Sequence, residues 1–384
     1  MTSTSPRRRY TTPSPPRWSA GRPRGCRPTR GRGWSRGRFK AIDGLRRRAR
    51  FDASLAQIAS DLDAEAAASD AAEESGIDDD RLRLIFTCCH PALPPDARVA
   101  LTLREVCGLT TEQIAAAFLT PPPTVAQRIV RAKAKIRDAR IPYQVPSRSD
   151  LGDRLDSVLH VVYLVYNEGY WASSGDRLTR SDLADEAIRL GRLLVALLPE
   201  PEAQGLLALM LLHESRRAAR TTPAGELVLL EDQDRSRWDR QRIAEGAALV
   251  ARALGSRRVG PFALQAAIAA VHAESPGADR TDWREIVGLY DVLARIAPSP
   301  VVELNRAAAV AMRDGPAAGL ALIDALLARR ELDDYHLAHS ARAELCRRLG
   351  RRAEARASYA RALDLARQEP ERRFLERRLA ELAG

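Results

Sequence analysis

The spacing of apolar residues divides the chain into stretches of different character. Residues 1–37 contain no Leu, Ile or Val and show no period. In the short basic stretch 38–51 apolar residues recur every three positions, as on one face of a helix. Residues 52–80 are acidic and Ala-rich, and helical patterning continues over 82–137. The sequence IPYQVPSRS at 141–149 has two prolines and no period, which predicts a boundary.

Beyond this boundary the pattern predicts helices almost throughout. Apolar residues follow a helical period in the segments 151–166, 182–198, 202–214, 240–254, 262–273, 282–297, 301–312, 317–328, 335–349, 352–367 and 371–382. GELVLL, residues 225–230, is a candidate for one short strand. We therefore expect an all-α fold whose helices pack in antiparallel pairs.

The last part of the chain contains an internal repeat. Gly315 and Gly350 lie 35 residues apart, and each separates two predicted helices. Small and aromatic residues follow the second break at Ala355, Tyr359 and Ala362. These offsets are similar to a tetratricopeptide repeat (TPR) of about 34 residues, which predicts TPR-like repeats near 301–384. The alternative is an ordinary helical hairpin in an Ala-rich protein.

Two helices separated by a firm stop are predicted within residues 108–137. Thr110 and Gln113 have the spacing of a capping box at the start of the first helix. Pro121–Pro123 must end that helix near Leu119, because a residue before proline is displaced from the helical region. Thr124 and Gln127 repeat the capping spacing, so a second helix is expected to begin there.

The second helix has an apolar stripe and a basic face. Val125, Ile129, Ala132 and Ile136 share one face. The outward residues are Thr124, Gln127, Arg128, Arg131, Lys135 and Arg137. Two helices, a short turn and a basic second helix are typical of a DNA-binding helix–turn–helix, in which Gln and Arg can contact bases and later basic residues phosphates. The alternatives are a solvated basic hairpin and, for Gln127, a role as a cap.

Charge is distributed unevenly in this chain of 384 residues. Residues 1–50 carry 16 Lys/Arg and one acid, and residues 51–80 carry ten acids and no Lys/Arg. Residues 81–140 carry ten basic and four acidic residues, which leaves 35 of each for the remainder of the chain. Polyanion binding is therefore expected in the first 140 residues. No apolar run approaches the ~18 residues of a membrane span, and five cysteines form no disulfide framework, which favours a reducing, cytoplasmic compartment.

The sequence gives only weak signals for metal binding or catalysis. Cys88, Cys89 and His90, with Cys107 elsewhere, have poor spacing for zinc, so no metal site is expected. No phosphate loop, nucleophile elbow or H-E-x-x-H motif occurs, so we expect neither an enzyme nor a cofactor.

A dense polar cluster follows the predicted strand. Its members are Glu231, Asp232, Asp234, Arg235, Arg237, Trp238, Asp239 and Arg240. The cluster suggests an intramolecular or partner contact through Asp232, Asp234, Arg235, Arg237 and Trp238. The alternatives are acid–base work and a charged turn in which Asp239 or Asp234 caps the next helix. The stretch 167–171, NEGYW, is expected to end a helix with Gly169 as its C-cap and to pack on the basic helix pair.

Residues 81–143 resemble region 4 of bacterial extracytoplasmic-function sigma factors, within the group that carries a long C-terminal extension with TPR-like repeats. Extension segments that are similar to this group are 158–176, 206–217, 229–240, 264–274 and 289–311. The resemblance covers about 38–384. It implies that the chain binds core RNA polymerase and directs it to promoters, with the helix–turn–helix reading double-stranded −35 DNA. No anti-sigma factor is evident.

The resemblance also assigns residues. Thr124, Val125, Gln127, Arg128 and Arg131 match its recognition-helix positions, and Lys135 completes the candidate DNA-binding set. The extension, 150–384, is expected to regulate activity. A second hypothesis is a helical-repeat scaffold whose DNA-binding module is not competent for transcription initiation.

The N-terminus departs from the family, which has a full helical region 2. Only 38–51 resembles the end of that region, so Arg46, Arg47, Arg48 and Arg50 are candidate DNA-backbone contacts of a remnant. In 1–37, 26 residues are Arg, Pro, Gly or Ser, which predicts disorder and suggests a mis-started or frameshifted segment. A natural arginine-rich arm is the alternative. Residues 52–80 match the acidic linker between regions.

Overall fold

The computed structural model describes residues 77–141, 146–174, 178–256 and 258–382. All of them belong to one unit of the chain, residues 51–384. Throughout these ranges the regular structure is helical, and no strand is present. The predicted all-α class is therefore confirmed. The expectations for 1–37, for 38–51 with Arg46, Arg47, Arg48 and Arg50, and for most of the acidic linker lie outside the described residues.

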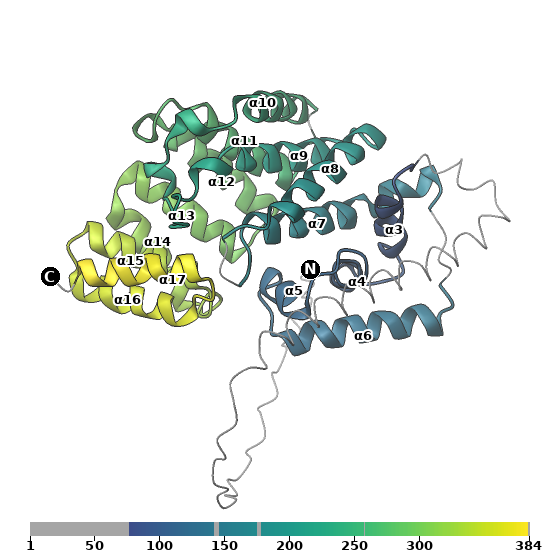
Figure 1. Ribbon diagram of the computed structural model, residues 1–384, viewed down its shortest axis with the longest axis horizontal. Helices are drawn as coiled ribbons and strands as arrows, with labels where there is room; N and C mark the ends of the chain where they lie inside the picture. Colours follow the sequence, from purple (N-terminus) through teal and green to yellow (C-terminus); the bar gives the residue numbers. More distant parts are fainter. Residues whose placement is uncertain (1–76, 142–145, 175–177, 257, 383–384) are drawn as a thin grey trace, which may run out of the picture. The chain divides into compact units, whose positions relative to one another are not determined.

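Most helices follow one another with short connections, whereas residues 215–239 form a long one between α9 and α10 (Figure 1). Their bounds are α3 (Asp80–Cys88), α4 (Pro95–Glu105), α5 (Thr111–Ala117), α6 (Pro122–Asp138), α7 (Leu151–Tyr170), α8 (Ser181–Leu197), α9 (Pro201–Glu214), α10 (Arg240–Gly255), α11 (Pro261–Glu274), α12 (Trp283–Ile296), α13 (Pro300–Asp314), α14 (Pro316–Ala328), α15 (His336–Arg348), α16 (Arg352–Leu365) and α17 (Glu369–Glu381). Single 3₁₀ turns occur at η1 (Arg148–Asp150), η2 (Arg217–Ala219), η3 (Leu230–Asp232), η4 (Arg235–Arg237) and η5 (Ala278–Arg280).

The helices predicted after residue 150 are confirmed as α7 to α17. The short strand considered at 225–230 is wrong. Thr221 and Leu227 form an isolated antiparallel bridge, and Leu230 already belongs to η3. Gly225 has a positive φ of 77°, so the chain turns inside the segment rather than continuing as a strand.

The centre of the extension is α9. Its buried residues lie on all sides of the helix, from Ala203 to Glu214, because α7, α8, α10 and α11 surround it. A helix that is apolar all round must be enclosed in this way. At Gly205 the backbone of α11 comes so close that a Cβ would meet the Ala263 nitrogen at 2.5 Å.

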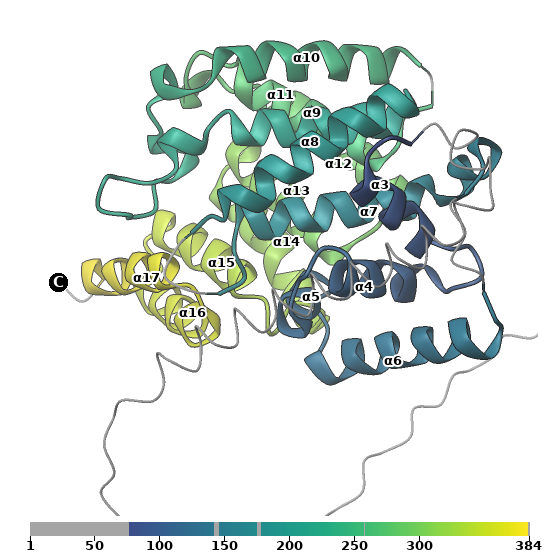
Figure 2. The ribbon, with the colours of Figure 1, turned by 45° about the vertical axis from the view of Figure 1, so that its right-hand side comes forward.

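The C-terminal helices form two antiparallel hairpins, α13 with α14 and α15 with α16, followed by α17 (Figures 1 and 2). Gly315 and Gly350 turn the chain in the two hairpins with positive φ values of 97° and 73°. The predicted break positions are thus confirmed. Tyr359 is 1% exposed, and Ala355 and Ala362 are fully buried, so these small and aromatic residues lie in the core of the C-terminal helices.

The N-terminal helices share a hydrophobic core with the extension. One cluster of buried residues extends from Ile77 through Phe86 and Val125 to Val158 and beyond, into α11. Arg154 of α7 is 7% exposed and donates to the Phe86 carbonyl at 2.9 Å. The boundary predicted at 141–149 therefore interrupts the helices but not the core. Ile77 is 2% exposed, so folded structure begins before residue 81.

Gly169 does not cap α7. The helix continues to Tyr170, and Trp171 is its C-cap. A Cβ on Gly169 would lie 2.4 Å from the backbone nitrogen of Ala184, so the glycine permits α8 to cross α7 at close range. The sequence pattern did not distinguish a glycine that packs from one that ends a helix.

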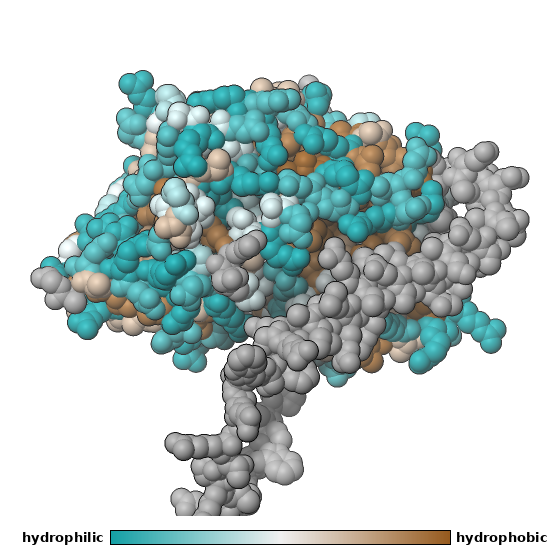
Figure 3. Space-filling model, in the orientation of Figure 1, coloured by the Kyte–Doolittle hydropathy of each residue, from teal (hydrophilic) through white to brown (hydrophobic). Residues whose placement is uncertain are grey.

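Hydrophilic side chains cover most of the visible surface over α15 to α17 (Figure 3). In the described ranges, no helix is both long and apolar enough to cross a membrane.

We expect Gly169→Ala to destabilise the protein by roughly 2 kcal/mol, because the new methyl group meets backbone atoms that cannot move independently. Gly288→Ala is the matched control. Gly288 is exposed inside α12 with nothing near its Cβ position, so alanine should stabilise by about 1 kcal/mol through helix propensity. Urea denaturation of both variants measures the two shifts. Shifts of the same sign would contradict the packing at Gly169.

Candidate nucleic-acid interface

The first helix of the predicted pair begins with a full capping box. The backbone nitrogen of Gln113 donates to the Thr110 hydroxyl at 3.2 Å, and the Thr110 nitrogen donates to the Gln113 side-chain oxygen at 2.7 Å. The prediction at α5 is therefore confirmed. Two of the N–H groups that a helix start leaves unpaired are satisfied in this way.

The turn between α5 and α6 has a Leu where most helices place a glycine. Thr120 N donates to Ala115 O, and Leu119 N donates to Ala116 O, which is the Schellman pattern of a helix end. Leu119 has a φ of 49° and is 54% exposed. A left-handed conformation is costly for a residue with a Cβ, so this turn is strained but fixes the chain direction sharply.

The second helix starts earlier than its capping spacing predicts. Pro121 is the N-cap, α6 begins at Pro122, and Thr124 makes no side-chain cap bond. The predicted start at Thr124, with Gln127 as capping partner, is therefore wrong. Proline fits the first helical turn because its missing N–H would have no partner there and its φ is already helical. Gln127 is consequently exposed and free of a capping role.

The predicted apolar stripe of α6 faces the core. Val125 is fully buried, and Ile129 and Ala132 are 8% and 3% exposed. Ile136 is half-buried and packs against the same core. Burial of Val125 corrects its place among the candidate DNA contacts, because its side chain has no surface to offer a partner.

The other candidate DNA-binding residues differ in their exposure and in the contacts that they already make. Thr124, Gln127 and Arg131 are exposed. Lys135 is exposed and donates to the Ala92 carbonyl. Arg128 is half-buried, pairs with Asp96 at 3.4 Å and lies over the Phe118 ring at 5.9 Å.

These contacts divide the basic face into two kinds of residue. Contact of Arg128 with a base would require it to leave Asp96, whereas Arg131 has no ion pair with any described residue. Lys133, which the prediction did not include, pairs with Glu105 of α4 at 2.9 Å. Arg131 is therefore the guanidinium on this face that is most available to a partner.

The extension leaves the outer face of α6 uncovered. α6 packs on α4 and α5, whereas α7 packs on α3, α4 and α5 from the opposite side (Figures 1 and 2). No helix of the described extension lies over Thr124, Gln127 or Arg131, which all remain exposed.

A buried carboxylate joins α5 to the extension. Gln113 donates from its amide nitrogen to Glu168 of α7 at 2.8 Å, and Ser173 N donates to the same carboxylate at 3.2 Å. Glu168 is 6% exposed, and this desolvation raises its pKa, while the bonds from Gln113 and Ser173 lower it. The expected packing of NEGYW on the helix pair is therefore confirmed through Glu168.

A network of exposed ion pairs makes a second link. Arg189 of α8 bonds Asp79, the N-cap of α3, at 2.6 Å, and Arg81 bonds Glu186 of α8 at 2.9 Å. Such surface pairs contribute little free energy each, so the apolar core and Glu168 carry most of the junction. The sequence carried no signal for these links, because their partners lie far apart along the chain.

The polar cluster after residue 230 makes mostly intramolecular contacts. Asp234 accepts from Ser236 N in η4, and Asp239 accepts from Gln241 N and Arg242 N at the start of α10. The alternative of a charged cap is thus confirmed for these two residues. Arg237 is exposed and has no ion pair with a described residue.

Arg235 and Trp238 hold the segment on α11. Arg235 donates to the carbonyls of His272 and Ser275 at 2.7 and 2.6 Å and lies over the Trp238 ring at 4.6 Å. Trp238 is 3% exposed. The predicted intramolecular contact is therefore confirmed for both residues.

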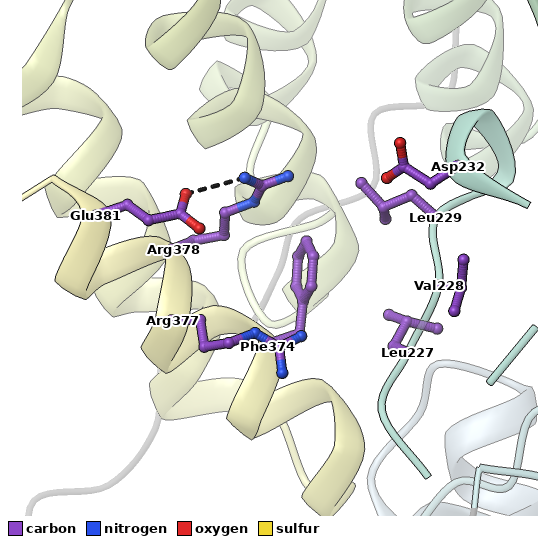
Figure 4. A pocket seen from close by; sticks show the side chains of 8 residues that line it. All are labelled: Leu227, Val228, Leu229, Asp232, Phe374, Arg377, Arg378 and Glu381. Atoms are coloured by element: carbon purple, nitrogen blue, oxygen red, sulfur yellow. Dashed lines mark hydrogen bonds and ion pairs between the residues drawn. The ribbon is translucent and has the colours of Figure 1, made fainter. Parts of the chain in front are cut away.

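Asp232 lines a shallow pocket between residues 227–229 and α17 (Figure 4). Phe374 projects from α17 toward this strip of chain, and Glu226 pairs with Arg373 and Arg377 of the same helix. The C-terminal helix is in this way attached to the loop that precedes η3.

Two of the cysteines near the helix pair stay protonated at neutral pH. Cys88 and Cys89 are buried and Cys107 is half-buried. Desolvation raises the pKa of Cys89 and of Cys107 to about 12, so neither forms a thiolate at neutral pH. Among the described residues, no group of three His, Cys, Asp or Glu side chains could hold a metal ion.

Comparison with known proteins agrees with this geometry. Residues 83–136, which extend from α3 into α6, match the family described as Sigma-70, region 4, so the chain carries the DNA-binding module of the sigma-70 class. Residues 154–254 match a family of unknown function, DUF6596. An uncharacterized protein of Rhizobium meliloti (strain 1021) is 46% identical over 351 residues, 91% of this chain and 82% of that protein. The chain belongs to the family of that protein.

We expect Leu119→Gly to be more stable than Leu119→Ala by about 1 kcal/mol. Both variants lose the same half-exposed side chain, but only glycine adopts the positive φ of the turn without strain. Chemical denaturation of the two variants measures the difference. Equal stability would show that residue 119 does not adopt the left-handed conformation in solution.

Proposed function

We propose that the chain is a sigma factor of the extracytoplasmic-function type that directs core RNA polymerase to promoters. In this proposal α5 and α6 read double-stranded −35 DNA, and the extension, 150–384, with TPR-like repeats near 301–384, regulates that activity. The main support for this proposal is that the region 4 match coincides with a helix–turn–helix whose second helix presents a polar face that the described extension leaves uncovered. A cytoplasmic location follows from these partners.

The exposed residues of α6 suggest distinct roles. Thr124 and Gln127 lie in the first two turns of α6, the part of a recognition helix that enters the major groove. A Gln amide can pair with adenine, and an Arg guanidinium with guanine. Arg131 and Lys135 lie later along the helix, where phosphate contacts are expected. Arg128 supports the turn through Phe118 and Asp96 and would contact DNA only after exchanging its partner.

The junction supports a role of the extension in positioning the helix pair. Gln113 caps α5 with its oxygen and bonds Glu168 with its nitrogen, so one side chain connects the helix–turn–helix to α7. The uncovered face of α6 favours regulation through the angle or rigidity of the pair over direct blocking of DNA. The domains 1–37, 38–51 and 52–80 remain predictions from the sequence.

The test is selection of DNA by the full chain, alone and with core RNA polymerase, from a pool of random duplexes. We expect one sequence element to be enriched. Gln127→Ala should relax base preference at one position, whereas Arg131→Ala should weaken all duplexes and lower the slope of log affinity against log salt by about 1.

Arg252→Ala is the control, since Arg252 of α10 is also exposed. It should change neither base preference nor salt slope. Failure of the chain to bind core polymerase, together with no enriched duplex, would reject the sigma proposal and favour the helical-repeat scaffold. Identical effects of Arg131→Ala and Arg252→Ala would reject the assigned DNA face.

A further inference from the structure

Three arginines gather around the rings of Tyr170 and Trp238, with Trp171 beside Arg220, inside the region that matches the family of unknown function. The Arg220 guanidinium lies over the Tyr170 ring at 3.6 Å and donates to the Tyr170 carbonyl at 2.6 Å. Arg216 donates to the Tyr170 hydroxyl at 2.8 Å and lies 5.9 Å from the Trp238 ring centre. Arg235 lies over the same Trp238 ring at 4.6 Å. Arg216 thus stands between the two rings and connects the other two guanidinium groups.

None of these three arginines forms an ion pair with a carboxylate of the described residues, although Glu214 acts on Arg220 at longer range. Glu214, which is 4% exposed, accepts from the Tyr166 hydroxyl and pairs with Arg217. Asp279 interacts with Arg235 only at longer range and makes no ion pair with it. By contrast, most arginines on the helices of this chain that lie partly buried, such as Arg342, bond a carboxylate. A buried charge without a counter-charge in direct contact is unfavourable, so the cluster lacks an anion that bonds its guanidinium groups.

Two hydrogen-bond donors in the cluster are buried and have no acceptor. Arg220 is 3% exposed, and its second terminal nitrogen has no partner. Trp238 is also 3% exposed, and its indole nitrogen has no partner. Unpaired buried donors cost about 1–3 kcal/mol each, more when charged, and folded proteins rarely leave them unsatisfied. Both donors require an acceptor, and both lie beside positive charge.

Two histidines beside the cluster are neutral. Desolvation, with the charges of Arg216 and Arg235 acting in the same direction, lowers the pKa of His272 to about 4. Desolvation also lowers the pKa of His213 well below its usual value, with Arg216 and Arg220 acting in the same direction. Neither ring adds charge at neutral pH, and both are consistent with a positive local potential.

The cluster has two partly exposed and two buried members. Arg216 and Arg235 are half-buried, whereas Arg220 and Trp238 are each 3% exposed. A polymer backbone or a protein surface is too large to bond the buried Arg220 nitrogen. A small anion with several oxygen acceptors matches the spacing of planar guanidinium donors.

We propose that Arg216, Arg220, Arg235 and Trp238 form a binding site for a small oxyanion, of the phosphate class, in the extension. The anion neutralises the cluster and accepts from the two unpaired donors. The proposal is independent of DNA binding. Arg216 and Arg220 contact Tyr170 at the end of α7, two residues after Glu168 and its bond to the helix–turn–helix, so occupancy changes the environment of that junction.

The test uses the full chain and inorganic phosphate, with binding measured by calorimetry and stability by thermal unfolding against sodium chloride of equal ionic strength. We expect phosphate to raise Tm where chloride does not, and Arg216→Met to lower phosphate affinity about tenfold or more. Arg237→Met is the matched control, because Arg237 is exposed in η4, the turn that carries Arg235, and has no ion pair with a described residue. It should leave the affinity unchanged.

Two further arms separate the explanations. Arg131→Ala removes a basic group of α6, so unchanged phosphate affinity in that variant excludes the helix–turn–helix as the site. Binding of AMP is compared with binding of inorganic phosphate. Tighter binding of AMP indicates an organic phosphate as the ligand, and weaker binding indicates the free anion. If Arg216→Met does not fold, Arg235→Met takes its place and should show the same loss. Equal effects of phosphate and chloride, or equal binding by the Arg216 and Arg237 variants, would overturn the proposal.

Discussion

The packing of α7 against α3, α4 and α5 is the constraint on which the rest of the structure depends. Phe86 is fully buried at this junction, and Arg154 of α7 reaches its carbonyl. Burial of each large apolar side chain contributes roughly 2 kcal/mol, so a shared core of this size favours a single folded unit. The region 4 module is therefore held by the extension, although a proline-containing break separates them along the chain.

This arrangement determines which surface remains for a partner. Because α7 occupies one side of the α4–α5 pair, α6 lies on the other, with Val125 and Ile129 turned inward. The strained turn at Leu119 and the prolines of the first helical turn then set the direction of α6. A sharp, stiff connection of this kind suits a helix that must present Gln127 and Arg131 in a defined orientation.

Helices were predictable from the sequence because their apolar period and their Gly and Pro breaks are local. The failures also have local causes. The capping spacing of Thr124 and Gln127 was outweighed by the fit of Pro122 to a helix start, and Gly169 was needed for close packing instead of a cap. The bond from Gln113 to Glu168 joins positions 55 residues apart, so no local pattern could predict it. The arginine cluster is likewise visible only after the helices are placed.

Native-state hydrogen exchange on the full chain tests the shared core most directly. If α3 to α5 and α7 are one cooperative unit, the slowest amides of α4 and α7 should open with the same free energy and respond equally to denaturant. The account would be contradicted if the amides of α3 to α6 exchanged together, through an opening whose free energy is well below that of the amides in α7 and α9. Region 4 would then be an independent domain that the extension merely touches.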